Sequence, residues 1–224
     1  MRLNADFTKR VVIRPEDRKW VASPSSGVER MMLDRIGEEV ARATTIVRFA
    51  PDSAFDAHTH GGGEEYLVLE GVFSDEHGDY PAGTYVRNPI GTAHRPHIGP
   101  EGATILVKLH QFDAGDTAQT VVRTAEAAFG PGDAPGVEVL PLHDVPGETV
   151  VLERYAPGAS VTGRRLPGGA EVFVLSGRLS DADGSYPKGT WLRLPPGATA
   201  EFRAEDGCLI YLKTGHLAAM VDAA

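Results

Sequence analysis

The chain has 224 residues, long enough for one large hydrophobic core or two smaller ones, and we expect two domains. Lys and Arg number 22 against 31 Asp and Glu, which gives a formal net charge of -9 and argues against a nucleic acid as a direct ligand. The single cysteine, Cys208, excludes an internal disulfide, and neither a signal peptide nor a membrane span is evident, so we expect a cytoplasmic protein that does not bind membranes.

The composition predicts an all-β protein rich in turns. The sequence has 26 glycines and 16 prolines but keeps an ordinary hydrophobic fraction of 42%, which is typical of a folded chain with many reversals. The strands expected in the first half cover residues 44–49, 66–69, 84–87 and 104–109. Residues 76–79 and 182–185 are expected as hairpin loops, and residues 124–129 are the one stretch with helical character. Short strands between turns favour an antiparallel sandwich or barrel.

An internal repeat divides the chain. Residues 65–71 (EYLVLEG) align with residues 171–177 (EVFVLSG), and in the same register residues 80–84 (YPAGT) align with residues 186–190 (YPKGT). The dipeptide Ser74-Asp75 also recurs, as Ser180-Asp181. So many coincidences in one register indicate a duplication. We therefore expect an N-terminal domain over residues 1–124, a linker rich in Gly and Pro over residues 125–135, and a C-terminal domain over residues 136–224.

Histidines and a glutamate form a candidate metal site in the first half. His58 and His60 are two residues apart, so in a strand both imidazoles point to the same face. A loop of three glycines follows and lets the chain reverse closely, which brings Glu64 toward the same point, while His94 comes from another hairpin. Three imidazoles and one carboxylate suit Zn, Fe, Mn, Ni or Cu and are a poor set for Ca or Mg.

The second half lacks this set as a whole. In the repeat register the four polar residues are replaced by Arg164, Leu166, Ala170 and Ala200, although the Gly, Pro and Tyr positions around them persist. Residues with independent structural roles need not disappear together. Ligands of one ion have little use once one or two of them are gone, so their joint loss favours a shared metal in the first half.

The motifs resemble those of a known family. The pattern His58-x-His60-x3-Glu64-x6-Gly71, followed by Gly83-x5-Pro89-x-Gly91-x2-His94, is similar to the two cupin motifs, and residues 64–76 and 80–89 resemble the ChrR-like cupin family. The chain departs from the usual cupin pattern at Asp52, where glycine is common, and at Ile98, where asparagine is common. Neither departure removes a candidate ligand.

The resemblance implies two tandem cupin barrels of the jelly-roll type. It implies a metal held by His58, His60, Glu64 and His94, with zinc expected and Fe, Mn or Ni as alternatives. It does not imply anti-sigma activity, because the sigma-binding part of ChrR proteins is a separate zinc domain with histidines and cysteines. Residues 1–43 here contain neither residue type, so we expect that domain to be missing. By family analogy we also expect a homodimer.

Further residues are candidates for the pocket around the metal. Tyr66 shares strand parity with Glu64, so it could reach a ligand or pack in the core with its hydroxyl satisfied. Arg95 and His97 lie close to His94 in the chain and could bind an anion, although a solvated loop position is the favoured role for each. Glu65 recurs in the copy without ligands, so its role is expected to be structural, in an ion pair with a repeated arginine such as Arg87 or Arg193.

Three classes of function stay open from the sequence. One is a metal-dependent enzyme acting on a small molecule, such as a dioxygenase or isomerase, although Glu64 departs from the three-histidine site of related diketone dioxygenases. Another is a sensory or transcription-regulatory protein, in which four protein ligands fill a tetrahedral zinc and the protein partner is unknown. The third is a scaffold that a metal merely stabilises. A small-molecule ligand at the metal is expected in the first class, and the regulatory class is favoured by the ChrR resemblance.

Overall fold

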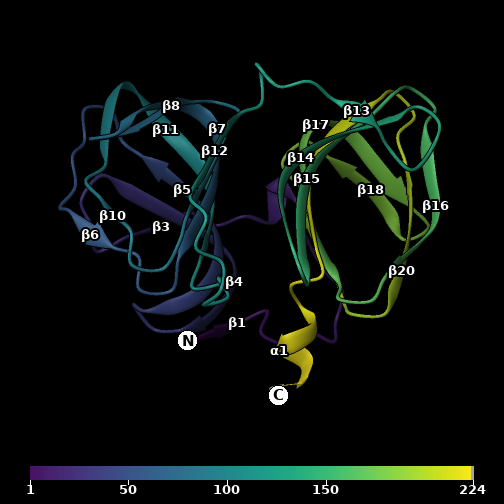
Figure 1. The fold of residues 1–224 in the computed structure, drawn as a ribbon, viewed down its shortest axis with the longest axis horizontal. Coiled ribbons are helices and arrows are strands. Elements are labelled where there is room, and N and C mark those ends of the chain that lie inside the picture. Colours follow the sequence, from purple (N-terminus) through teal and green to yellow (C-terminus); the bar gives the residue numbers. More distant parts are fainter. Residues whose placement is uncertain (223–224) are drawn as a thin grey trace. The chain divides into compact units, whose positions relative to one another are not determined.

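A computed structural model describes residues 1–222 and divides the chain into two compact units. Unit 1 comprises residues 1–5 and 19–127, and unit 2 comprises residues 6–18 and 128–224. Both are built almost entirely of antiparallel strands, which confirms the all-β class (Figure 1). Within the described residues, no helix reaches the length and apolar character that crossing a bilayer requires.

Unit 1 contains a nine-stranded sheet with the order β1-β4-β5-β11-β7-β9-β12, in which β3 also pairs with β4 and β8 with β7. A separate two-stranded sheet joins β6 and β10 (Figure 1). The strands are β1 (Arg2–Leu3), β3 (Val21–Ala22), β4 (Val28–Gly37), β5 (Ala41–Phe49), β6 (His58–Thr59), β7 (Glu64–Asp75), β8 (Gly78–Pro81), β9 (Thr84–Asn88), β10 (Ala93–His94), β11 (His97–Leu109) and β12 (Thr120–Arg123). The four strands expected from the sequence lie within β5, β7, β9 and β11.

Unit 2 repeats this plan in a ten-stranded sheet with the order β13-β14-β15-β21-β17-β19-β2, to which β16, β18 and β20 are attached. Its elements are β2 (Val11–Ile13), the 3-10 turn η1 (Pro15–Asp17), β13 (Gly130–Pro131), β14 (Val137–Val145), β15 (Glu148–Tyr155), β16 (Ser160–Leu166), β17 (Ala170–Asp181), β18 (Gly184–Pro187), β19 (Trp191–Leu194), β20 (Ala198–Arg203), β21 (Cys208–Thr214) and α1 (Ala218–Asp222).

Two features of the chain path differ from the sequence interpretation. The segment with helical character, residues 124–129, forms turns and enters β13 without a helix, and the α-helix α1 lies at Ala218–Asp222 instead. Residues 6–18 belong to unit 2 because β2 pairs with β19. The domain limits expected at residues 124 and 136 stay a prediction.

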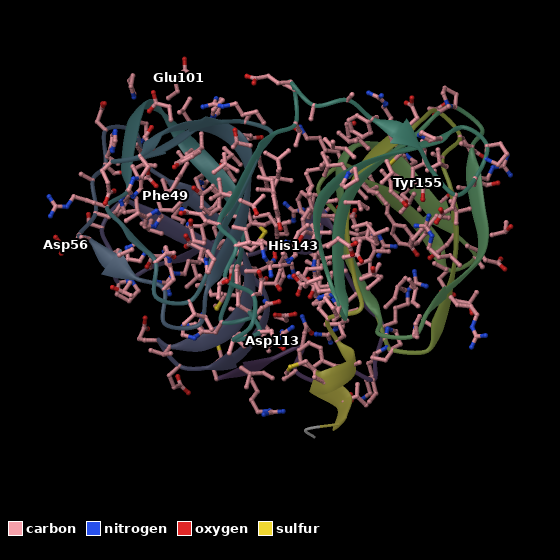
Figure 2. All side chains as sticks on the ribbon, in the orientation of Figure 1. Phe49, Asp56, Glu101, Asp113, His143 and Tyr155 are labelled. Atoms are coloured by element: carbon pink, nitrogen blue, oxygen red, sulfur yellow. The ribbon has the colours of Figure 1, made fainter. Side chains whose placement is uncertain are left out.

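Each unit has its own apolar core. In unit 1 the inward side chains include Val47 on β5, Tyr66 and Val68 on β7 and Ile105 on β11, all buried. Side chains alternate across these paired strands, so one face of each strand lines the interior. In unit 2, Tyr155 is one of the buried side chains that pack together in the core (Figure 2). The metal-site candidates of unit 1 lie beside such an interior.

Candidate metal centre

Backbone pairing brings the two halves of the site together. The β6–β10 register places His58 directly opposite His94. The pairing continues past β6, because the His60 backbone N–H donates to the Thr92 carbonyl at 2.9 Å and the His60 carbonyl accepts from Gly91 N–H at 3.0 Å. The two histidine motifs, which are separate in the sequence, therefore face one another across one hairpin-like pair of segments.

The glycine loop lets Glu64 approach the histidines. A Cβ on Gly62 would clash with the side chain and backbone of His110, and one on Gly63 would clash with the Phe112 side chain. Gly63 also has a φ of 75°, which side chains disfavour. Only glycine fits these positions without displacing the neighbouring segment, so the loop can turn tightly and start β7 at Glu64.

The four predicted ligands converge. One donor atom from each of His58, His60, Glu64 and His94 can be chosen so that all lie within 4.8 Å of one another. Glu64 Oε2 is 3.3 Å from His60 Nε2 and 3.6 Å from His94 Nε2, and the Nε2 atoms of His58 and His94 are 3.2 Å apart. His58 is exposed, whereas the other three are buried. The cluster therefore lies at the edge of the interior with one side toward solvent.

Hydrogen bonds set the orientation of each imidazole. His58 Nδ1 lies 3.3 Å from the Asp56 carbonyl, and His94 Nδ1 lies 3.1 Å from Asp75 Oδ2, so both Nδ1 atoms carry the proton. His60 Nδ1 lies 2.8 Å from Thr92 Oγ1. The Thr92 hydroxyl donates to the Pro89 carbonyl at 2.7 Å, so it accepts from His60. In all three rings the Nε2 lone pair is left to point into the cluster.

These lone pairs fit a bound cation. With Nδ1 protonated, the Nε2 atoms of His58 and His94 present lone pairs to each other at 3.2 Å, and a cation between them would relieve that repulsion. His60 Nε2 is buried and has no hydrogen-bond partner among residues 1–222. A buried polar atom without a partner is costly unless something binds it. The donor set thus matches a transition-metal site.

Electrostatics favour the protonation states that bind metal. Burial raises the pKa of Glu64, but the three neighbouring histidines, His60 first among them, outweigh that effect and lower the pKa overall. Burial lowers the pKa of His94 and outweighs the opposing effects of Glu64 and Asp75. The carboxylate is therefore anionic and the imidazole neutral, which are the forms that coordinate cations.

Asp75 contacts the candidate site, and the sequence interpretation missed it. Its Oδ2 accepts from His94, while its Oδ1 accepts from Tyr80 Oη at 3.1 Å and from the His77 backbone N–H at 2.8 Å. A carboxylate behind a ligating histidine fixes the ring and its tautomer. The one signal for it in the sequence is the recurrence of Ser74-Asp75 as Ser180-Asp181, which indicates the repeat but not a contact with His94.

Unit 2 shows what replaces the site when the ligands are gone. Arg164 faces Ala200 in the same register that pairs His58 with His94, and its guanidinium forms an ion pair with Glu153 at 2.8 Å. Leu166 and Ala170 are buried and apolar. An internal ion pair and apolar side chains therefore occupy the positions that carry metal-site residues in unit 1.

A cavity of about 600 Å³ opens onto the cluster. Its lining includes His58, Glu64 and His94. The rest of the lining is mixed, with several polar residues and apolar side chains from β4, β5, β7 and β11. It includes Val28, Arg30, Arg35, Val47, Phe49, Phe55, Asp56, Phe73, Ile105, Val107 and Leu109, of which Phe49 and Asp56 are labelled in Figure 2. The volume falls within the range of roughly 300–1,000 Å³ that is typical of small-molecule sites.

The other candidate pocket residues lie elsewhere. Tyr66 is buried in the core against Phe73, and its hydroxyl has no hydrogen-bond partner among the described residues. Burial raises the pKa of this phenol far above its usual range, so Tyr66 stays protonated. Arg95 and His97 have exposed side chains. None of Tyr66, Arg95 and His97 is among the described residues that line the cavity.

Comparison with known proteins identifies the family. A model of the ChrR cupin-like domain matches residues 8–113 and again residues 117–218. The chain belongs to this cupin family. The double match confirms two cupin domains in tandem, each of them a β-rich barrel. No curated protein matches the chain at a significant level.

Solved structures share the two-domain cupin fold at low sequence identity. A proposed dioxygenase of Nostoc punctiforme is 17% identical, with a TM-score of 0.73 over 97% of this chain and 83% of the other. A bacterial pirin of Escherichia coli, solved with nickel(II), is 12% identical, with a TM-score of 0.68 over 92% and 98%. A mutant of Bacillus subtilis oxalate decarboxylase is 14% identical, with a TM-score of 0.63 over 91% and 76%. At these identities the likeness shows the fold.

Proposed function

We propose that this cupin protein holds a divalent transition metal in its first barrel and binds a small organic molecule there as an enzyme substrate. One observation carries the proposal: the cavity of about 600 Å³ is lined by three of the four metal-site residues, His58, Glu64 and His94. A purely structural metal is normally closed off by its own ligands. A cluster that faces a cavity of ligand size instead suits a site where a second molecule meets the ion.

Residues of the chain would prepare this site in three ways. His58, His60, Glu64 and His94 would hold the ion, and Asp75 would keep the His94 ring oriented toward it. The bound ion would supply Lewis acidity toward an oxygen-bearing group or the capacity to activate O2. Apolar side chains of the cavity would desolvate the bound molecule, which strengthens electrostatic contacts inside the site. No residue is assigned as a general base.

The identity of the metal is part of the proposal. Three nitrogen donors and one oxygen donor suit zinc first, with Fe, Mn or Ni as alternatives. The pirin with the same fold was solved with nickel(II), which supports a transition metal in this type of barrel. Glu64 sets the donor set apart from one made of three histidines alone.

A regulatory or sensory zinc protein is the second candidate. The family match, to a ChrR cupin-like domain, favours it. The four donors could complete a tetrahedral zinc and leave no position for a substrate. In that case the ion would stabilise the barrel, and the cavity would serve a different ligand or remain a packing defect.

Coordination number separates the two candidates. X-ray absorption spectroscopy on protein purified without added metal should show the histidine and carboxylate ligands plus at least one exchangeable water. That result would support an enzyme. A four-coordinate zinc with only protein ligands, unchanged when small oxygen-donor ligands are added, would contradict the enzyme proposal and favour the regulatory one.

A further inference from the structure

Two arginines lie on the inward face of β4 in unit 1. Arg30 pairs with Val47 of β5, and Arg35 pairs with Ala43, two positions whose side chains point into the barrel. A β-bulge between Met32 and Asp34 lies between the two arginines and reverses the alternation of side chains between the two faces of β4. Without the bulge, Arg30 and Arg35 would lie on opposite faces of the strand. With it, both side chains line the cavity that contains the metal cluster.

Both guanidinium groups have donors to spare. Arg35 is only 7% exposed, and its side-chain hydrogen bonds within residues 1–222 use Nη2 alone, toward the backbone carbonyls of Glu38 and Glu39. The Arg30 side chain makes no hydrogen bond to any described residue, and its nearest carboxylate is that of Glu39, at 3.9 Å. The Glu39 side chain is 76% exposed, so this contact is weak. Arg35 is buried and the Arg30 side chain is 29% exposed, so both present N–H donors to the cavity that suit an anionic ligand.

Strand register relates this pair to the metal cluster. Arg35, Ala43, Leu109 and Glu64 form one row across β4, β5, β11 and β7. Three strand spacings of about 4.8 Å separate the ends of the row, or about 14 Å along the curved sheet. Both side chains reach inward from these ends, which shortens the gap. A molecule of a few carbons can therefore span from the guanidinium groups to the ion.

We propose that the cavity binds a small organic acid. Its carboxylate would contact Arg30 and Arg35, its apolar body would lie along the wall that includes Val47 and Ile105, and an oxygen-bearing group at its other end would reach the metal. Arginine favours carboxylates because its fork of N–H donors matches their two oxygens. This inference names the substrate class of the proposed function and rests on that function.

Matched metal-binding probes test the arginine end separately. The probes are alkyl hydroxamates of graded chain length that end either in a carboxylate or in the corresponding primary amide. The hydroxamate supplies the oxygen donors for the ion in both series, so the difference between acid and amide reports only on the far end. Calorimetric titration of the metal-loaded protein should show the best acid binding at least about tenfold tighter than its amide, equal to about 1.4 kcal/mol.

The control is an arginine of equal charge outside the cavity. In the double variant Arg30→Gln and Arg35→Gln the acid should lose its preference over the amide. In Arg48→Gln the preference should stay, because Arg48 is exposed on β5 and pairs with Glu29. Retention of the preference in the double variant, or equal loss in Arg48→Gln, would overturn the inference.

Two further measurements distinguish a failure of the organic-acid inference from a failure of the metal proposal. Metal content is measured for each variant, and Arg30→Gln alone is included because the Arg30 side chain has no hydrogen bonds in the described structure that the substitution would remove. A variant that keeps its metal but shows no change in acid preference refutes only the organic-acid assignment. If the unmodified protein takes up no metal, the proposed function and this inference fall together.

Discussion

Replacement of Asp75 by Asn should weaken metal binding without touching a ligand. Asp75 Oδ1 accepts from the His77 backbone N–H, which can only donate, so the amide oxygen of an asparagine must take that position. Its NH2 group would then face His94 Nδ1, which also carries a proton. The imidazole must rotate away or move its proton to Nε2, the atom that faces the cluster.

The expected size of the effect follows from similar carboxylate–histidine pairs at metal sites. Loss of such a partner typically lowers metal affinity by about 10- to 100-fold, which corresponds to about 1.4–2.7 kcal/mol. Competition with a chromophoric chelator, using zinc as the probe ion, measures the dissociation constant directly. The far-ultraviolet circular dichroism of the variant should match that of the unmodified protein, because the substitution keeps the side-chain shape.

The duplication provides a matched control. Asp181 in unit 2 accepts from the Asp183 backbone N–H at 2.9 Å and from Tyr186 Oη at 2.6 Å, as Asp75 does from its own turn. Asp181 Oδ2 accepts from Arg10 at 2.6 Å, whereas Oδ2 of Asp75 accepts from His94. Asp181→Asn should leave the zinc affinity unchanged. Equal losses in both variants, or none in Asp75→Asn, would refute the assigned role of Asp75.

Three other predictions concern the ligands and the core. Glu64→Gln should weaken zinc binding by more than the ~100-fold expected for a residue that only orients a ligand, because it removes a charged donor to the ion. The same chelator competition measures this loss, and a smaller one would argue against Glu64 as a ligand. Removal of metal by a chelator should lower the midpoint temperature of the first thermal unfolding transition by about 10 °C, because a ligand at 100 times its dissociation constant stabilises the folded state by ~2.7 kcal/mol. An unchanged midpoint would indicate that no bound ion supports the fold. Arg87→Met should destabilise the protein by about 3–5 kcal/mol in urea unfolding, because the buried Glu65 and Asp116 lose their shared guanidinium; a loss below ~1 kcal/mol would contradict that contribution.

Local spacing in the sequence was sufficient to predict that three of the candidate metal-site side chains converge. His58 lies in β6, His60 directly follows that strand, and the glycines before Glu64 allow a tight reversal, so the convergence of these three side chains depends on few contacts distant in sequence. His94 joins them only through the pairing of β6 with β10. The predicted ion pair of Glu65 with Arg87 is confirmed, with Nη1 donating to Oε2 at 2.6 Å. That pair is a cross-strand neighbour in the β7–β9 register, which the repeat made visible.

Features set by long-range pairing or by strand irregularities could not be predicted in the same way. The assignment of β2 to unit 2 depends on its pairing with β19, which no local pattern in residues 11–13 indicates. The two cavity arginines, Arg30 and Arg35, have opposite parity in the sequence and share a face only because of a bulge. The contact of Asp75 with His94 could not be predicted, because the sequence does not show which side chain lies behind the His94 ring.

Metal analysis of protein purified without added metal, together with a His94→Ala variant, tests the central claim most directly. His94 contributes a buried Nε2 that faces both His58 and Glu64, so its removal takes away a donor from the middle of the cluster. The unmodified protein should contain an equimolar amount of one divalent transition metal, and His94→Ala should contain little or none. Full metal content in the variant, or no metal in the unmodified protein, would contradict the assignment of the first barrel as a metal site.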